Sequence, residues 1–181
     1  MRIVAGLYGG RRLLVPKGRD VRPTSDKVRG AMFNTLSGYL DFDGVHVLDA
    51  FCGTGALGLE AISRGAGDVV FIDKARESLA LARENVEALG VSGQAVFKSG
   101  DALTAHLNPP STFDLVFLDP PYRQGMIEKT LQNLALQDVL ADGAICVLES
   151  EKAHDPVLPS GFVLLKDKAY GDTRVSYVCY K

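Results

Sequence analysis

Short hydrophobic runs alternate with amphipathic stretches along most of the chain. The runs at 45–49, 68–73, 95–97, 113–118 and 144–149 have the length of strands that are buried on both faces of a sheet. Helices are predicted between them: one after Gly58 to about Arg64, one with the hydrophobic positions Leu79, Ala82, Val86 and Leu89, and one at 127–136, and Gly90 is expected to end the second one. Strands that alternate with helices form right-handed βαβ units, so the pattern predicts an α/β fold with a mostly parallel sheet.

Both ends of the chain depart from this alternation. Residues 2–15 alternate loosely around Gly9-Gly10 and predict a short β-hairpin. Residues 24–26 supply capping side chains for a following helix, whose hydrophobic stripe runs from Val28 through Met32 and Leu36 to Tyr39 or Leu40. Residues 162–180 predict a second hairpin that turns at 170–172 and adds an antiparallel pair at one edge. One domain (1–181) is expected, with a hairpin and helix (1–40) ahead of a core (41–181).

Composition narrows the class of protein. The 181 residues are 46% hydrophobic, which is enough for one sizeable core. No hydrophobic run approaches the length that spans a membrane, and the chain starts without a signal-peptide pattern, so a cytoplasmic protein is expected. The three cysteines and three histidines lack the spacing of a metal site or a catalytic triad, so no metal is expected.

Charge is unevenly distributed along the chain. The net charge is −2, yet residues 1–30 hold eight Lys or Arg and only two Asp, which is a local excess of +6. The net charge argues against a general nucleic-acid binder, whereas a basic segment on an acidic body predicts a local anionic partner at this end of the chain. The alternative is a solvated surface segment without a partner.

A glycine-rich turn predicts a nucleotide-type cofactor. Gly53-x-Gly55-x-x-Gly58 follows a strand, and Asp73 ends the next strand twenty residues beyond Gly53. A pyrophosphate would lie near Asp49, where like charges repel, whereas the ammonium and sulfonium groups of S-adenosylmethionine would be attracted. Asp73 would then accept from the ribose hydroxyls. Asp101, followed by Ala102, would accept from the adenine amino group.

The sequence Asp119-Pro120-Pro121-Tyr122 follows the hydrophobic run at 115–118. The prolines end the strand, because each lacks a backbone N–H. The carboxylate and the exposed carbonyls supply acceptors, and Tyr122 offers a stacking surface, which suits a planar base with an exocyclic amino group. The alternative is a strand terminator with a capping Asp.

These motifs together resemble those of amino-group methyltransferases that depend on S-adenosylmethionine. The segments at 2–6, 22–29, 33–34, 55–61 and 170–174, with Glu149, resemble the RsmD family in particular, over essentially the whole chain. Cys52 and Thr54 depart from the Ala and Ser usual in that family. The resemblance implies a Rossmann-like class I methyltransferase fold with a seven-stranded sheet. It also implies methyl transfer to N2 of one guanine in 16S ribosomal RNA, either naked or within an assembled small-subunit particle.

The motifs, the basic N-terminal segment and the resemblance together assign site residues. Catalysis is assigned to Asp119, Pro120, Pro121 and Tyr122; cofactor binding to Asp49, Phe51, Gly53, Gly55, Asp73, Lys74, Asp101 and Ala102; and RNA contacts to Arg11, Arg12, Arg19, Arg22, Thr24 and Arg123. Three other readings stay open on the sequence alone. They are a nicotinamide-dependent dehydrogenase, a non-enzymatic RNA-binding or assembly factor, and a methyltransferase acting on adenine N6 or a glutamine amide.

Overall fold

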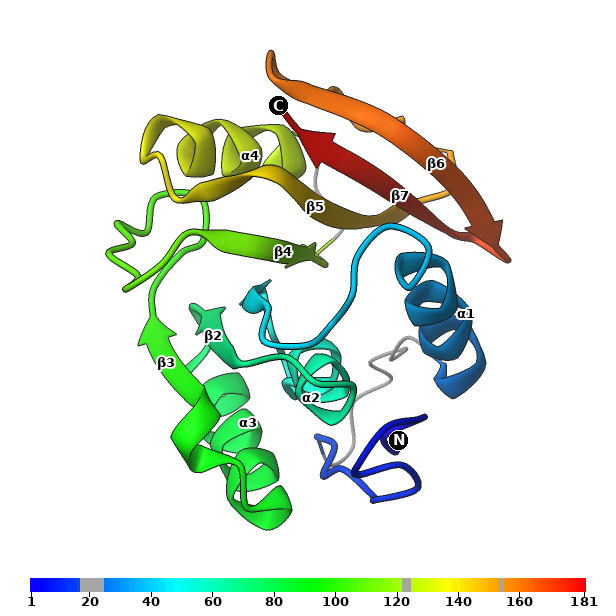
Figure 1. Ribbon diagram of the computed structural model, residues 1–181, viewed down its shortest axis with the longest axis vertical. Coiled ribbons are helices and arrows are strands. Elements are labelled where there is room, and N and C mark those ends of the chain that lie inside the picture. Colours follow the sequence, from blue (N-terminus) through cyan, green and yellow to red (C-terminus); the bar gives the residue numbers. More distant parts are fainter. Residues whose placement is uncertain (17–24, 122–124, 154) are drawn as a thin grey trace.

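A single twisted sheet organises the protein. The computed structural model describes residues 1–16, 25–121, 125–153 and 155–181. Their strands form a seven-stranded sheet in the order β3-β2-β1-β4-β5-β7-β6 (Figure 1). The strands are β1 (His46–Ala50), β2 (Asp68–Asp73), β3 (Ala95–Ser99), β4 (Phe113–Leu118), β5 (Leu140–Glu151), β6 (Phe162–Tyr170) and β7 (Thr173–Tyr180). The helices are α1 (Asp26–Leu36), α2 (Ala56–Ser63), α3 (Arg76–Leu89), the short 3-10 helix η1 (Ser92–Gln94) and α4 (Met126–Leu136).

Strand pairing confirms the predicted fold class. β1 to β5 pair in parallel, and β7 runs antiparallel to both β5 and β6 at one edge of the sheet. The predicted C-terminal hairpin is therefore correct. The chain winds outward from β1 to β3 and then returns to place β4 on the other side of β1. Ligands bind in Rossmann-like folds at such a reversal, outside the carboxyl ends of the strands.

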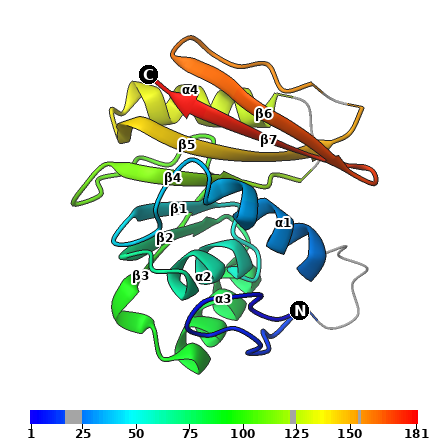
Figure 2. The ribbon, with the colours of Figure 1, turned by 45° about the vertical axis from the view of Figure 1, so that its right-hand side comes forward.

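The helices cover the two faces of the sheet unequally. Buried hydrophobic side chains of α1, α2 and α3 pack on one face, in a core cluster with Val47, Phe71, Phe117 and Tyr177. Side chains of α4 pack on the opposite face, against Leu48, Val116 and Leu148 (Figure 2). No helix in the described ranges is long and apolar enough to cross a membrane.

The helix α1 begins where the sequence predicted, but it buries a different stripe. Ser25 caps it by accepting from the Val28 N–H at 3.2 Å. Its buried side chains are Arg29, Met32, Phe33 and Leu36, so the predicted stripe was correct for Met32 and Leu36, whereas Val28 is half-buried. Beyond the helix, Leu40 packs on the core, and Tyr39, the other position predicted for the end of the stripe, is exposed. The register differs because Arg29 takes a core position, where its guanidinium lies 3.7 Å from the Glu60 carboxylate of α2.

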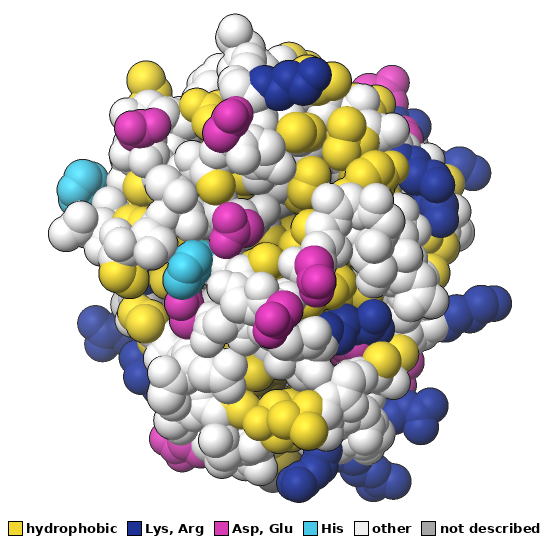
Figure 3. All heavy atoms as spheres, viewed as in Figure 1, with side chains coloured by type: hydrophobic (Ala, Val, Ile, Leu, Met, Phe, Trp, Pro, Cys, Tyr) yellow, Lys and Arg dark blue, Asp and Glu magenta, His cyan; other side chains and the backbone are white. Residues whose placement is uncertain are grey.

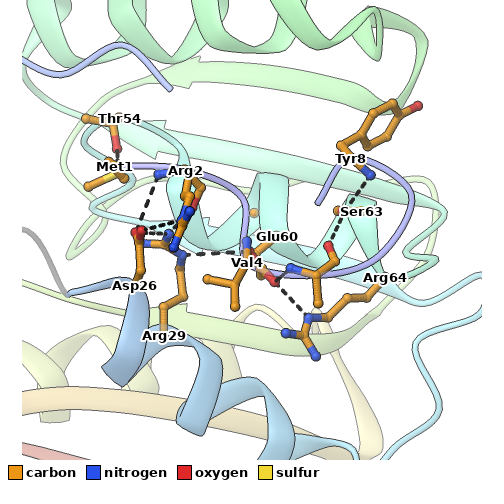
Figure 4. Close-up of polar contacts among 12 residues, drawn as sticks. Met1, Arg2, Val4, Tyr8, Asp26, Arg29, Thr54, Glu60, Ser63 and Arg64 are labelled. Carbon is orange, nitrogen blue, oxygen red and sulfur yellow. Dashed lines mark hydrogen bonds and ion pairs between the residues drawn. The ribbon is translucent and has the colours of Figure 1, made fainter. Parts of the chain in front are cut away.

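The predicted N-terminal hairpin was only partly correct. Its strands reduce to one antiparallel bridge between Arg2 and Arg12, because backbone groups of the segment bond to α2 instead. Glu60 accepts from the Val4 N–H at 2.7 Å and the Ala5 N–H at 3.1 Å, as Figure 4 shows in part. The segment therefore lies flat against α2 rather than standing as a separate ribbon.

Gly6 allows this close approach. Its φ is +80°, and a Cβ built there would lie 1.8 Å from the Ser63 carbonyl oxygen at the end of α2. The Ser63 carbonyl instead accepts from the Leu7 N–H at 2.7 Å, and the Ser63 hydroxyl accepts from the Tyr8 N–H at 3.0 Å (Figure 4). No side chain larger than hydrogen fits between the segment and α2 at this point.

Candidate functional site

An open pocket of about 900 Å³ lies at the carboxyl ends of the central strands. It is lined by Asp49 of β1, by Phe51 and Gly53 of the turn that follows, and by Asp119 after β4. The N-terminal segment and the first turns of α3 form other walls, with Met1, Leu14, Val15, Glu77 and Ser78 among the lining residues. The size suits a nucleoside-sized ligand together with part of a second molecule.

An acidic residue stands at, or within two residues of, the carboxyl end of each of the five parallel strands. In the order of the sheet, β3 to β5, these residues are Asp101, Asp73, Asp49, Asp119 and Glu149. Parallel strands end at one edge, so the five carboxyl groups form a row along it, which we call the acidic row. Such a row disfavours phosphates and suits a cationic ligand.

The glycine turn has the backbone geometry that its sequence predicts. Gly53 and Gly55 have φ of 53° and 76°, and Phe51 also has a positive φ, of 63°. The Asp73 carboxylate accepts from the Gly53 N–H at 3.0 Å and from the Ala75 N–H at 2.8 Å, so it fixes both this turn and the entry to α3.

The third glycine brings α2 close to the sheet. A Cβ on Gly58 would lie 2.5 Å from the Phe71 ring of β2, so glycine is required for this contact. The Gly58 N–H donates to the buried Asp49 carboxyl at 2.9 Å. Asp49 therefore links the end of β1 to the first turn of α2 beneath the pocket.

Burial governs the protonation of the central carboxyl groups. It raises the pKa of Asp49 to about 8, with a smaller contribution from the negative charge of Asp73. Burial also raises the pKa of Asp119 well above its ordinary value, and the carboxylates of Glu149 and Asp49 add to this. The pKa of Asp49 therefore lies above neutral pH, and a cation placed against either carboxyl group favours its ionised form.

The residues present fit S-adenosylmethionine. The pocket wall offers carboxyl groups for an ammonium and a sulfonium, and the turn of Gly53 and Gly55 brings backbone close to a bound nucleoside. Cys52 lies in the same wall, where burial raises the pKa of its thiol, so it is a neutral packing group.

The other predicted cofactor residues are not among those that line the pocket; they are Gly55, Asp73, Lys74, Asp101 and Ala102. The Asp101 carboxylate accepts from the Leu103 N–H at 3.0 Å, and Ala102 is buried beside it. Lys74 is exposed. Of the predicted catalytic residues, Pro120 is buried and Pro121 is exposed, while Tyr122 lies outside the described residues.

The basic N-terminal segment is less charged at the surface than the sequence count suggested. Arg29 is fully buried, with its guanidinium 2.9 Å from the Asp26 carboxylate, and Arg2 pairs with the same Asp26 at 3.1 Å (Figure 4). Counting Arg29 in a surface patch was therefore wrong. Arg11 and Arg12 are exposed. Basic side chains gather at the lower right of the face in Figure 3, over the N-terminal part of the chain. Arg19, Arg22, Thr24 and Arg123 lie outside the described residues.

Sequence reasoning missed the polar side chains that hold the pocket walls together. Glu60 is fully buried on α2, and Asn85 is 1% exposed on α3. Asn85 donates to the carbonyls of Leu14 and Thr54, which join the N-terminal segment to the glycine turn. The sequence feature that could have identified them was a polar residue within the hydrophobic stripe of a helix. Across the described ranges, no group of three or more His, Cys, Asp or Glu is arranged to hold a metal ion.

Comparisons with known proteins agree over the full length of the chain. A family model described as Conserved hypothetical protein 95 matches residues 1–179. A protein from Haemophilus influenzae named Ribosomal RNA small subunit methyltransferase D is 34% identical, with 100% of this chain and 93% of that protein covered. The protein of the same name from Escherichia coli is 35% identical, with 100% and 89% covered.

Solved structures share the fold. The structure of the Escherichia coli protein yhhF matches with a TM-score of 0.86 at 33% identity, covering 100% of this chain and 98% of that one. The magnesium protoporphyrin IX methyltransferase of Synechocystis, solved with bound SAM, shares the fold at 20% identity, with a TM-score of 0.65 over 86% and 79% of the two chains. With the family model matching residues 1–179 and relatives above 30% identity over 93% and 89% of their own lengths, the chain belongs to the Conserved hypothetical protein 95 family, which is the RsmD family of methyltransferases.

Proposed function

We propose that the protein transfers a methyl group from S-adenosylmethionine to the exocyclic N2 amino group of a guanine in small-subunit (16S) ribosomal RNA. The observation that carries the proposal is the placement of Asp49 and Asp119 in the wall of one pocket, beside the turn of Gly53. One carboxyl group lies where a cationic cofactor would bind, and the other lies where an amine would approach it. The names of the relatives, which act on the RNA of the small ribosomal subunit, support the substrate class.

The cofactor supplies an electrophilic methyl group on a sulfonium when it is bound. Asp49, Phe51, Gly53, Gly55 and Asp73 would hold it, with Lys74, Asp101 and Ala102 at the far end of the acidic row. Asp73 already binds two backbone N–H groups, and each carboxylate oxygen has a second lone pair for a ribose hydroxyl.

Asp119 would orient the target amine. The lone pair of an aromatic amine is delocalised into the ring, so the amine is a weak nucleophile until its N–H bonds are held out of conjugation. The Asp119 carboxylate and the Pro120 carbonyl would each accept one N–H of the amine, and Tyr122 would stack on the base. Positioning and electrostatic preorganisation then supply most of the acceleration. The base must leave its stack to reach the pocket.

The N-terminal segment would contact the RNA backbone. Arg11 and Arg12 are exposed on the segment that forms one wall of the pocket, so phosphates held there would bring a neighbouring base to Asp119. Arg19, Arg22, Thr24 and Arg123 are proposed as further contacts. An assembled small-subunit particle would add contacts that this modest surface charge does not supply.

Methylation mapping tests the proposal. Ribosomal RNA from cells with and without the gene would be digested and its modified nucleosides located by mass spectrometry. We expect the loss of one N2-methylguanine from small-subunit RNA, restored by the wild-type gene and not by an Asp119→Ala variant. If a methylated adenine, or a methyl group on DNA or protein, were lost instead, that group would be the methyl acceptor in place of guanine N2. An unchanged pattern would contradict the proposal.

The same reaction repeated with purified components would identify the form of the substrate. Naked small-subunit RNA and assembled small-subunit particles, both from cells lacking the gene, would be incubated with labelled S-adenosylmethionine. Methyl incorporation into particles alone would show that ribosomal proteins, or the folded RNA that they hold, form part of the recognised surface.

A further inference from the structure

Glu149 extends the acidic row beyond Asp119, on the side away from the cofactor turn. In the sheet, β4 lies between β1 and β5, and Leu118 of β4 pairs with Leu148 of β5. The next residues on the two strands are therefore Asp119 and Glu149, which places them side by side at the carboxyl edge. Asp119 thus stands between Asp49 on one side and Glu149 on the other.

Glu149 also points to the same face of the sheet as the pocket. Side chains alternate along a strand, and Ile145 and Val147 of β5 belong to the core cluster on the face covered by α1 to α3. Glu149 follows them at the same two-residue interval, as Asp49 follows Val47 on β1. The Glu149 side chain is only 6% exposed, and its negative charge contributes to the raised pKa of Asp119.

From this placement we infer that Glu149 selects guanine by accepting a hydrogen bond from the N1–H of the target base. The inference rests on the proposed function, since it concerns the base whose amine Asp119 holds. With the cofactor over Asp49 and the amine at Asp119, the rest of the base edge extends toward β5. Guanine carries N1–H directly beside its 2-amino group, so a carboxylate next to Asp119 meets a donor.

The same position rejects adenine. Beside its exocyclic amine, adenine presents an unprotonated ring nitrogen, whose lone pair would face the Glu149 carboxylate. Two buried acceptors that face each other form no hydrogen bond, and their lone pairs repel. A site built to bind a donor discriminates strongly against an analogue that lacks it. Glu149 is in this sense a specificity-determining residue, whereas Asp119 holds the reacting nitrogen.

The test compares guanine with 2-aminopurine at the methylated position of a small-subunit RNA. 2-Aminopurine keeps the 2-amino group but has an unprotonated N1. We expect the wild-type enzyme to prefer guanine by roughly 100-fold in kcat/KM. In Glu149→Gln the side-chain amide can accept from N1–H or donate to the N1 lone pair, so the preference should fall to within about fivefold. Glu151→Gln, at the exposed end of the same strand, should keep the wild-type preference.

The possible results distinguish a role of Glu149 in selecting the base from a role in maintaining the fold. Cofactor affinity measured by calorimetry verifies that Glu149→Gln is folded, and Glu149→Ala provides a second variant that can neither accept nor donate. A variant that loses activity equally on both RNAs, with the preference intact, would give Glu149 a purely structural role and overturn the inference. A wild-type enzyme that methylates guanine and 2-aminopurine equally well would also overturn it. An enzyme that methylates no guanine at all would instead overturn the proposed function.

Discussion

Asn85 and Leu14, 71 residues apart in the sequence, exchange two hydrogen bonds across the pocket wall. The Asn85 amide oxygen accepts from the Leu14 N–H at 2.7 Å, and its nitrogen donates to the Leu14 carbonyl at 3.1 Å. The same nitrogen donates to the Thr54 carbonyl in the glycine turn at 3.0 Å. One buried side chain therefore holds the N-terminal segment and the cofactor turn in fixed relation to each other.

Replacing Asn85 with Ala should lower the free energy of unfolding by about 3 kcal/mol, because three hydrogen bonds are lost and their backbone partners lie in a partly buried wall. Urea denaturation measures this change. Asn34→Ala, at an exposed position of α1, is the matched control and should change stability by less than about 0.5 kcal/mol. Equal stabilities of the two variants would show that the segment is held by its other contacts with α2.

Cofactor binding should release a proton from Asp49. The pKa of this carboxyl is raised to about 8 in the free protein, so it is protonated at pH 7, and a bound sulfonium lowers that pKa by favouring the carboxylate. Affinity for S-adenosylmethionine should consequently weaken as pH falls below about 8. Calorimetry at pH 7, in buffers with different ionisation enthalpies, should report the release of close to one proton by the wild-type protein.

The Asp49→Asn variant is the control for proton release on cofactor binding, and the pH dependence of its stability should also differ from that of the wild type. It should release no proton on binding. Since the folded-state pKa of Asp49 is raised from 3.8 to about 8, its contribution to stability is full below the lower value and is lost as pH rises to the higher one, and Asp49→Asn should remove that part of the decline between the two. Proton release by the variant equal to that of the wild type would assign the proton to another group of the acidic row.

The Asp119→Ala variant should bind cofactor normally and transfer methyl groups roughly 100-fold more slowly, because it lacks one acceptor for the target amine. Asp119→Asn keeps an acceptor oxygen and should retain more activity than the alanine variant. Single-turnover rates at saturating cofactor and RNA give the comparison. Near-wild-type rates in both variants would mean that Asp119-Pro120-Pro121 only terminates β4.

Replacing both Arg11 and Arg12 with Ala should raise the KM for RNA, reduce the dependence of RNA binding on salt, and leave cofactor affinity unchanged, since each exposed arginine displaces counterions from a phosphate. Filter binding at several salt concentrations provides the measurement. A control variant with Lys166→Ala and Lys181→Ala removes two exposed charges from the opposite end of the chain and should bind RNA as the wild type does. Identical salt slopes for the two variants would remove the N-terminal segment from the RNA-binding surface.

The strand and helix pattern could be predicted from the sequence because each element is locally consistent. The run at 68–73 became β2 with the predicted bounds, and Gly90, with φ of 73°, ends α3 as its lack of a Cβ predicts. The C-terminal hairpin also turns where predicted, since Gly171 permits the positive φ that the turn requires.

What the sequence did not predict depends on contacts between distant residues. Arg29 and Glu60 are 31 positions apart in the sequence. The hydrophobicity pattern around either residue does not indicate that the two charges will pair within the core. The N-terminal hairpin was only partly correct for the same reason, because Glu60 and Ser63 bind some of its backbone N–H groups. Asp49, Asp73 and Asp119 were identified, but the effect of burial on the pKa values of Asp49 and Asp119 needs the three-dimensional structure.

The acidic row has a consequence for the proton inventory of the proposed reaction. Methyl transfer turns a sulfonium into a neutral thioether, and the methylated amine loses one proton, so one positive charge must leave the site or be carried by another group. Burial raises the pKa of both Asp49 and Asp119, so each binds a proton more readily when no cation faces it. As the sulfonium charge disappears, these two groups regain their affinity for the proton that the amine releases. The site can thus keep its net charge constant from bound substrates to bound products without a dedicated base.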